Sequence, residues 1–346
     1  MRFSIDQSDL LERFSRLVSV PSPVGYSIKL NPVLAEMAEE LGLSVTYDNK
    51  STAYITLDGE NNSKTVLIGA HADTLGLMVR CVEPNGMLKV RRLGGVCFPS
   101  IEGETVTVHT RDGREYTGLV ICRAHSVHVF EDAHTLERNE ESIRILLDED
   151  VKSAGDVARL GIRNGDMISI EPRCQITEKG YVKSRFIDDK GAIACCFAAL
   201  NYLGEKGLRP KYRTIFAFPY CEEIGLGGTY VPEGVEEYIA LDIGLIGPEL
   251  EGSERSVSIC AKDASMPYDY GLVSRLIRCA ERAEVDYAVD LYYRYGSDAG
   301  AAMRGGNNLR HAAFGMAVYC SHGMERTHID GMVRTTGVLL AYLLGE

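Results

Sequence analysis

The sequence lacks the patterns that place a chain in a membrane or outside the cell. No run approaches the roughly 18 consecutive apolar residues of a membrane-spanning helix. The first residues, MRFSIDQSDLLERF, carry acidic side chains and no continuous apolar stretch, which does not predict a secretion signal. The ten cysteines are scattered without a CxxC pair, so we expect buried small hydrophobes rather than disulfides. These absences favour a cytoplasmic protein that does not bind membranes.

An excess of positive charge is also missing. The chain has 37 Lys and Arg against 49 Asp and Glu, a net charge of −12. Nucleic-acid binding depends on clustered Lys and Arg, so no nucleic-acid partner is expected. The 346 residues are 45% hydrophobic and 25% charged, which is ordinary globular composition. That length exceeds one compact core in most proteins and predicts two domains.

The hydrophobic pattern divides the chain into α/β and all-β parts. Helical spacing of apolar residues precedes KTVLIGA (residues 64–70), whose nearly continuous apolar character is typical of a strand buried on both faces of a sheet. After residue 75, short alternating runs are separated by three turn signals: Asn85-Gly86, Asp112-Gly113 and Asn164-Gly165. We predict an α/β domain of residues 1–74 and 183–346, with a β-rich domain of residues 75–182 inserted into it.

Five polar clusters stand where apolar runs end or are interrupted. They are His71-Ala72-Asp73, Asp188-Asp189, Glu222-Glu223, Asp242 and Ser321-His322. In open α/β sheets, ligands bind beyond the carboxyl ends of the strands, so these clusters are expected to meet in one crevice.

The residue types in these clusters suit divalent metal ions. Imidazole nitrogen and carboxylate oxygen are ligands for zinc or cobalt, and no thiolate is required. Burying several carboxylates without a cation is costly, because like charges disfavour one another's ionisation. Asp73 follows His71 by two residues and is expected to accept the second imidazole N–H, as partners of metal-bound histidines do. Each cluster alone also fits a core histidine or a solvated acidic loop; the ordered set favours a metal site.

At these residues the chain resembles the M42 metallopeptidases, which include glutamyl and tetrahedral aminopeptidases. AHADTLGLMV resembles the family's AHxDExGLMV, KSRFIDDKG its KALDDRxG, and EEIGLGG its EEVGxxG. ALDIG, YGSDAG and SHGMERTHID are similar to AxDxx, GGTDAG and HSPxExxHxD. These motifs occur in the family's order from about residue 65 to 330. The resemblance implies a mixed-sheet, zinc-peptidase-like catalytic domain with helices on both faces, and an inserted domain that mediates dimerisation.

The resemblance also implies a role for each residue. Two divalent ions, zinc or cobalt, would be held by His71 and Asp242 and by Glu223 and His322, with Asp188 bridging them. Related enzymes have a cis peptide bond after the bridging aspartate. The implied general base is Glu222, Asp73 orients His71, and the substrate contacts Ser297 and Asp298. The implied partners are peptide substrates and further copies of the chain, assembled into a homo-oligomer, a tetrahedral dodecamer in the family.

Several positions depart from the family pattern. Lys190 stands in place of Arg, Thr74 in place of an acidic residue, and Ser297 in place of Thr. The last motif is one residue short, which makes His328 a competitor of His322; we favour His322 because it directly follows the strand-like AVYC. The segment HSVHVFEDAH, from His125 to His134, has no family counterpart and is predicted to be an exposed polar loop rather than a metal site.

The predicted function is dinuclear metal-dependent hydrolysis of N-terminal residues from peptides, with Glu222 as the base. The alternative is deacylation of N-acylated amino acids or peptides at the same metals. More distant alternatives are a glycoside hydrolase, which needs two carboxyl groups and no metal, and an inactive interaction protein.

Overall fold

The computed structural model describes residues 3–345, which divide into two compact units. One unit runs up to Asp73 and resumes at Arg173, and the other comprises Thr74–Pro172. The second boundary therefore lies ten residues before the predicted one at residue 182.

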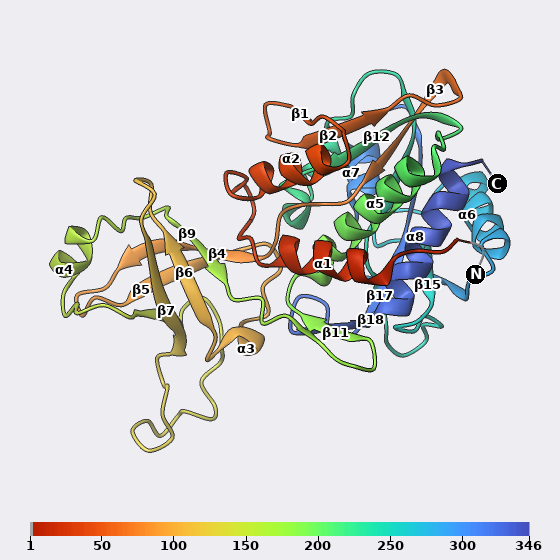
Figure 1. Cartoon of the computed structure of the whole chain (residues 1–346). Coiled ribbons are helices and arrows are strands. Elements are labelled where there is room, and N and C mark those ends of the chain that lie inside the picture. The colour runs from red at the N-terminus through yellow and green to blue at the C-terminus, as the bar shows by residue number, and fades with distance from the viewer. Residues whose placement is uncertain (1–2, 346) are drawn as a thin grey trace. The chain divides into compact units, whose positions relative to one another are not determined.

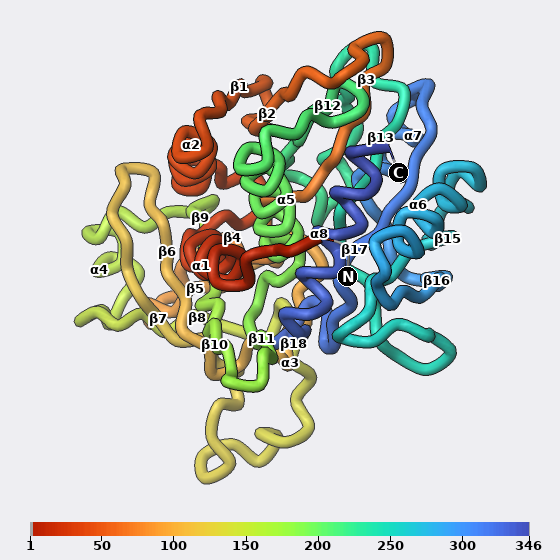
Figure 2. Tube along the Cα trace, turned by 45° about the vertical axis from the view of Figure 1, so that its right-hand side comes forward, coloured from red at the N-terminus to blue at the C-terminus, as the bar shows by residue number. Residues whose placement is uncertain are grey.

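Strand pairing explains this difference in the boundary. β10 (Gln175–Ile176) pairs with β11 (Tyr181–Ser184), and β11 pairs with β18 (Glu325–His328), near the carboxyl end of the chain. The three strands form a small sheet of their own and lie side by side in Figure 2. Residues 175–184 thus belong to the α/β unit.

A nine-stranded mixed sheet forms the centre of the α/β unit (Figure 1). β14 (Gly244–Leu245) pairs with β17 off the main path. The other strands, in their order across the sheet, are β1 (Thr46–Tyr47), β2 (Ala53–Leu57), β12 (Tyr212–Phe218), β3 (Asn61–Gly69), β13 (Val235–Leu241), β17 (Arg310–Val318), β15 (Val257–Lys262) and β16 (Tyr287–Leu291).

The four strands in the middle of this sheet are parallel. β3 pairs in parallel with β12 and β13, and β13 pairs in parallel with β17. Their residues are buried almost throughout from Val66, Thr214 and Tyr238 onward, as expected for strands covered on both faces. Parallel pairing places the carboxyl ends of all four strands at the same edge of the sheet.

Helices cover both faces of the sheet. Glu237 of β13 contacts one group of helices through Tyr342 and Arg275, and the next residue, Tyr238, faces the opposite side, where Figure 1 shows α7 behind the sheet. The helices of this unit are α1 (Gln7–Val18), α2 (Leu30–Glu40), α5 (Ile187–Lys206), α6 (Tyr270–Arg282), α7 (Asp298–Arg304) and α8 (Ile329–Leu343). The fold class predicted from the sequence is confirmed.

The sequence explains how individual helices begin. The Asp6 carboxylate accepts hydrogen bonds from the backbone of Ser8 and Asp9 at the start of α1.

In α5, Cys195 and Cys196 are fully buried among small residues, as predicted. All ten cysteines are free in residues 3–345. Among the same residues, no helix is long and apolar enough to cross a membrane.

The inserted unit is a closed β-barrel. Asn85-Gly86 and Asp112-Gly113 form hairpin turns, as predicted. Asn164-Gly165 lies between a helix and β9 and does not join two paired strands, so it is not a hairpin turn. Two short helices, α3 (Phe98–Ile101) and α4 (Ala154–Arg159), lie between strands. The barrel strands, in order, are β4 (Gly76–Val82), β5 (Leu88–Leu93), β8 (Ile143–Leu147), β7 (Glu115–Cys122), β6 (Thr105–His109) and β9 (Met167–Ile170).

Candidate metal centre and active site

Four of the five predicted clusters follow the carboxyl ends of the parallel strands. His71 follows β3, Glu222 and Glu223 follow β12, Asp242 follows β13, and His322 follows β17. Because these ends share one edge of the sheet, residues as far apart in sequence as His71 and His322 lie at one place. The fifth cluster, Asp188-Asp189, stands in the first turn of α5.

The side chains converge on Asp188. Its Oδ1 atom lies 2.9 Å from Nε2 of His71, and its Oδ2 atom lies 3.8 Å from Nε2 of His322. Glu222 Oε2 is 3.8 Å from Nε2 of His71, and Glu223 Oε2 is 3.5 Å from Nε2 of His322. Asp188 thus presents one carboxylate oxygen to each histidine, an arrangement that suits a ligand shared by two cations.

Residues 3–345 contain two sets of potential metal ligands, and within each set the ligand atoms lie within 4.8 Å of one another. One set comprises His71, Asp188 and Glu223, and the other comprises His71, Asp189 and Asp242. Asp189 was not assigned a role by the sequence analysis, although it belongs to the predicted Asp-Asp pair. Its Oδ2 atom accepts a hydrogen bond from the backbone N–H of His71 at 3.1 Å, and its buried Oδ1 atom has no hydrogen-bond partner in the described residues. The Asp188–Asp189 peptide bond is cis, as the family resemblance implies.

Asp73 contacts His71 mainly through its backbone. Nδ1 of His71 lies 3.0 Å from the Asp73 carbonyl oxygen and 3.6 Å from its Oδ1 atom. A proton on Nδ1 donates to this carbonyl and leaves Nε2 free for a metal ion. The Asp73 carboxylate accepts hydrogen bonds from the backbone N–H groups of Glu222 (3.1 Å) and Glu223 (3.2 Å). Asp73 therefore also fixes the start of the 3₁₀ turn η1 (Glu222–Ile224).

Glu325 is a buried acidic residue that the sequence analysis did not assign. Its two carboxylate oxygens accept hydrogen bonds from the backbone N–H of Asp188 (3.0 Å) and of His322 (3.2 Å). The only sequence signal was its place in the motif SHGMERTHID. Glu325 holds two candidate ligands that lie 134 positions apart.

His322 and His328 have different surroundings. His322 lines the cavity that contains Asp188 and Glu223. His328 caps α8: its Nδ1 accepts a hydrogen bond from the Asp330 N–H at 3.0 Å, and its Nε2 lies 2.7 Å from the Lys179 carbonyl oxygen. These contacts occupy both ring nitrogens of His328, so the geometry favours His322 as the ligand.

The predicted substrate residues lie beside the candidate metal ligands. Ser297 lines the same cavity and caps α7, and its Oγ atom lies 2.6 Å from the Tyr268 hydroxyl. Asp298 is buried, and its Oδ1 atom accepts a hydrogen bond from the Gly228 N–H at 2.6 Å. Its buried Oδ2 atom has no hydrogen-bond partner in residues 3–345. The cavity has a volume of about 410 Å³, enough for a small side chain and the adjoining peptide bond.

The family departures Lys190 and Thr74 are also buried. The Lys190 ammonium group donates a hydrogen bond of 2.5 Å to the Val20 carbonyl, and burial lowers its pKa to about 7. The Thr74 hydroxyl donates to the Leu75 carbonyl at 3.2 Å. Nothing in these contacts explains why the two residues differ from the family pattern.

Burial and mutual repulsion raise the pKa of most acidic groups in the cavity. Burial and then the neighbouring Asp188 raise the pKa of Asp242 to about 7 and that of Glu223 well above its usual value. Burial also raises the pKa of Glu222, although His71 opposes the shift. Burial lowers the pKa of His71, but hydrogen bonds to carboxylates outweigh this effect and leave it well above the usual value. A divalent cation among these carboxylates would favour their ionised forms.

The segment from His125 to His134 is an irregular loop of the barrel unit. His125, His128 and His134 are exposed, and the His125 ring packs against Phe130. Within residues 3–345, neither set of potential metal ligands includes these histidines.

Comparisons with known proteins agree with the motifs. Residues 51–337 match the family described as M42 glutamyl aminopeptidase. The chain is 38% identical over 334 residues to "Putative aminopeptidase YhfE" of Bacillus subtilis (strain 168), and the alignment covers 96% of each chain.

Two solved structures share the fold. Aminopeptidase APDkam598 from the archaeon Desulfurococcus kamchatkensis has a TM-score of 0.87 and 19% identity, covering 98% of this chain and 96% of its own. The TET1 peptidase of Pyrococcus horikoshii, which can assemble into a tetrahedron or a large octahedral shell, has a TM-score of 0.81 and 20% identity, covering 97% and 100%. The resemblance identified from the motifs is confirmed: the chain belongs to the M42 glutamyl aminopeptidase family and is a peptide hydrolase.

Proposed function

We propose that this protein removes N-terminal residues from peptides at a centre of two divalent metal ions, zinc or cobalt, with Glu222 as the general base. The observation that carries the proposal is the approach of His71, Asp188 and Glu223 to within 4.8 Å in a cavity that also contains Asp242 and His322. Imidazole and carboxylate donors in this number suit zinc or cobalt.

The proposed ligand sets are those that the family resemblance implies. His71 and Asp242 would hold one ion, Glu223 and His322 the other, and Asp188 both. Asp189 lies close enough to His71 and Asp242 to support the first ion. When bound, such ions lower the pKa of the attacking water and polarise the scissile carbonyl.

Glu222 would move the proton. Its carboxylate lines the cavity, and its backbone N–H is held by Asp73. In its ionised form the Glu222 carboxylate would accept a proton from water and later donate it to the leaving amine, and burial, which raises the pKa of this carboxyl, strengthens it as a base. Buried carboxylates around the site also favour a substrate whose α-amine is free and positively charged, which accounts for removal of residues from the N-terminal end.

A substrate panel combined with metal analysis tests this function. Purified protein is expected to contain up to two zinc or cobalt ions per chain and to cleave aminoacyl-p-nitroanilides with a free α-amine, and chelation should abolish turnover. Cleavage of N-acetylated substrates alone would instead support the deacylase alternative. Full activity after chelation, or metal content near zero in active protein, would overturn the proposal.

We further propose that the chain forms a homo-oligomer through its barrel unit and reaches a tetrahedral dodecamer in the cytoplasm. The TET1 peptidase supports this assembly by analogy. Leu119 of β7 and Leu146 of β8 are opposite each other in the barrel and are 38% and 44% exposed, which provides an apolar patch for self-association.

A further inference from the structure

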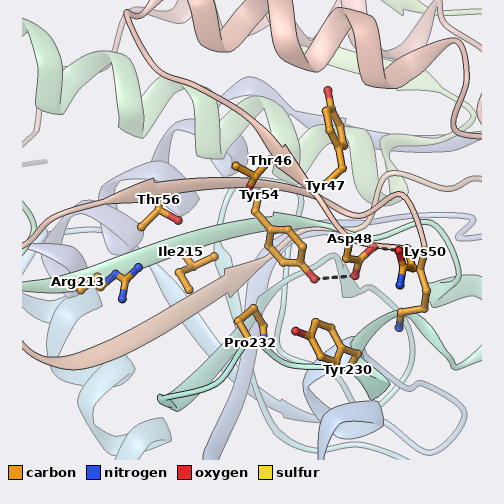
Figure 3. Close-up of a pocket in the computed structure, with 11 residues that line it drawn as sticks. Thr46, Tyr47, Asp48, Lys50, Tyr54, Thr56, Arg213, Ile215, Tyr230 and Pro232 are labelled. Carbon is orange, nitrogen blue, oxygen red and sulfur yellow. Dashed lines mark hydrogen bonds between the residues drawn. The ribbon is translucent and has the colours of Figure 1, made fainter.

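A second cavity, of about 720 Å³, lies over β1, β2 and β12 (Figure 3). None of its lining residues belongs to the proposed metal centre. We call it the tyrosine groove, after the residues that shape it: Tyr47, Lys50, Tyr54, Thr56, Arg213 and Tyr230.

The groove combines aromatic surface with one free cation. Tyr47 is 47% exposed and Tyr230 55% exposed, and Figure 3 shows Tyr54 and Tyr230 between Arg213 at one end and Lys50 at the other. The Tyr54 hydroxyl donates to Asp48 at 2.9 Å, which fixes the ring. The exposed Arg213 guanidinium has no hydrogen bond or ion pair with any residue in 3–345.

At the opposite end of the groove, Lys50 contacts the chain segment that follows Glu222 and Glu223. The Lys50 ammonium group lies 3.4 Å from the Leu226 carbonyl oxygen and 3.3 Å from that of Gly227. These residues stand just after η1, which carries Glu222 and Glu223. The groove and the metal centre therefore share one connecting segment.

This connecting segment is short and has an apolar surface. Gly225 lines the active-site cavity and Tyr230 lines the groove, so five residue steps, roughly 18 Å of extended chain at most, separate them. Leu226 on this segment is 51% exposed, and Ile224, which directly precedes the segment, is 49% exposed. An extended peptide of about six residues is long enough to cross from one cavity to the other.

We propose that the tyrosine groove binds the downstream part of a polypeptide substrate, several residues beyond the scissile bond. This inference rests on the proposed aminopeptidase function. The tyrosine rings receive side chains of the peptide, and Arg213 pairs with a peptide carboxylate, either the C-terminus or an acidic side chain. A polyanion such as nucleic acid does not fit, because the groove offers only Arg213 and the already engaged Lys50.

Substrate length provides the test. The metal-loaded enzyme is assayed with an aminoacyl-p-nitroanilide and with peptides of three and ten residues that share the same first residue. The ten-residue peptide is expected to have a lower KM than the three-residue peptide. Tyr230→Ala and Arg213→Ala should each lower kcat/KM for the long peptide roughly three- to tenfold, the loss typical of one aromatic or ionic contact, and leave the p-nitroanilide unchanged.

Matched variants and peptides identify the contacts. Tyr270→Ala and Arg282→Ala alter exposed residues of α6 outside the groove and should leave every substrate unaffected. If Arg213 binds the C-terminus, amidation of the long peptide reproduces the Arg213→Ala loss; if it binds an acidic side chain, replacing the distal Glu of the peptide by Gln does so.

Two results would overturn the proposal. One is a KM that does not depend on peptide length, and the other is an equal loss for short and long substrates in Tyr230→Ala. Fluorescence anisotropy of a ten-residue peptide with an internal fluorophore gives a readout independent of turnover. A protein that binds this peptide through Tyr230 yet cleaves no aminoacyl substrate would contradict the aminopeptidase function and leave the groove intact.

Discussion

Glu222 and Glu223 are adjacent in sequence but have different neighbours. The Glu222 carboxylate faces His71, whereas that of Glu223 faces His322 at 3.5 Å. The 3₁₀ turn separates the directions of the two side chains, and Asp73 fixes the turn by accepting from both backbone N–H groups. This separation allows one residue to move protons while its neighbour holds a cation.

Glu222→Gln is expected to retain its metal ions and to lose activity, because the amide cannot accept the proton of water. We expect kcat to fall by about 10²- to 10⁴-fold, the usual contribution of a general base. Metal content per chain and kcat on an aminoacyl-p-nitroanilide measure the two effects. Glu12→Gln on the exposed face of α1 is the control. Near-wild-type turnover of Glu222→Gln would remove the assignment.

His322 and His328 provide a matched pair of substitutions. Mutation of a residue that hydrogen-bonds to a metal ligand typically weakens metal binding ~10- to 100-fold. We expect His322→Ala, which removes a proposed ligand itself, to weaken metal binding by more than this. His328→Ala should retain the metal ions and reduce stability, because its side chain caps α8. Metal titration and thermal unfolding of both variants separate these roles. Loss of metal from His328→Ala alone would reverse the assignment.

At the scale of strands and helices, the sequence predicts features that depend on local pattern but not those that depend on pairing between distant segments. Apolar runs such as residues 64–70 end at polar pairs, so the positions of the strand ends and of the acidic clusters are predictable from local pattern. The pairing of β11 with β18 joins residues about 140 positions apart and leaves no local signal, which is why the domain boundary differs. The Glu325 and Asp73 carboxylates also accept hydrogen bonds from backbone groups that are distant in sequence, so these contacts could not be predicted from local pattern.

Glu237 on β13 connects several elements of the α/β unit. Its fully buried carboxylate pairs with Arg275 of α6 (2.6 Å), Lys64 of β3 (2.8 Å) and Arg310 of β17 (3.0 Å), and it accepts from the Tyr342 hydroxyl of α8 (2.6 Å). Burial raises the pKa of Glu237, but hydrogen bonds from Arg275, Lys64 and Tyr342 outweigh it and lower the pKa to about 2. Removing this charge leaves the partner cations poorly compensated.

Glu237→Gln is expected to lower the free energy of unfolding at pH 7 by ~3 kcal/mol. Because the folded pKa of about 2 lies below the ordinary 4.5, the stabilisation is complete above pH 4.5 and is lost as pH falls towards 2. The difference between wild type and variant in urea unfolding should therefore narrow over that range. Glu236→Gln, at an exposed site beside Arg310, should cost less than ~1 kcal/mol. A difference that stays constant from pH 7 to pH 3 would contradict this account.

At the scale of the whole molecule, the proposed assembly can be tested through the barrel unit. Leu146→Glu places a charge on the exposed pair that Leu146 forms with Leu119, without altering the α/β unit. We expect wild type to have the mass of twelve 38.1 kDa chains by light scattering and the variant to form smaller species. Lys152→Glu, at an exposed position of the same unit, is the control. Unchanged mass in Leu146→Glu would show that this patch does not join the subunits.

The position of β17 in the sheet makes the proposed site depend on a strand near the carboxyl end of the chain. This strand lies between β13 and β15 and precedes His322, so it must enter the middle of a sheet whose other strands are already made. A chain that ends before residue 322 lacks one of the five proposed ligands, and a chain without β17 leaves an open position between β13 and β15. We therefore expect the proposed metal centre to be completed only when the carboxyl end of the chain has been made.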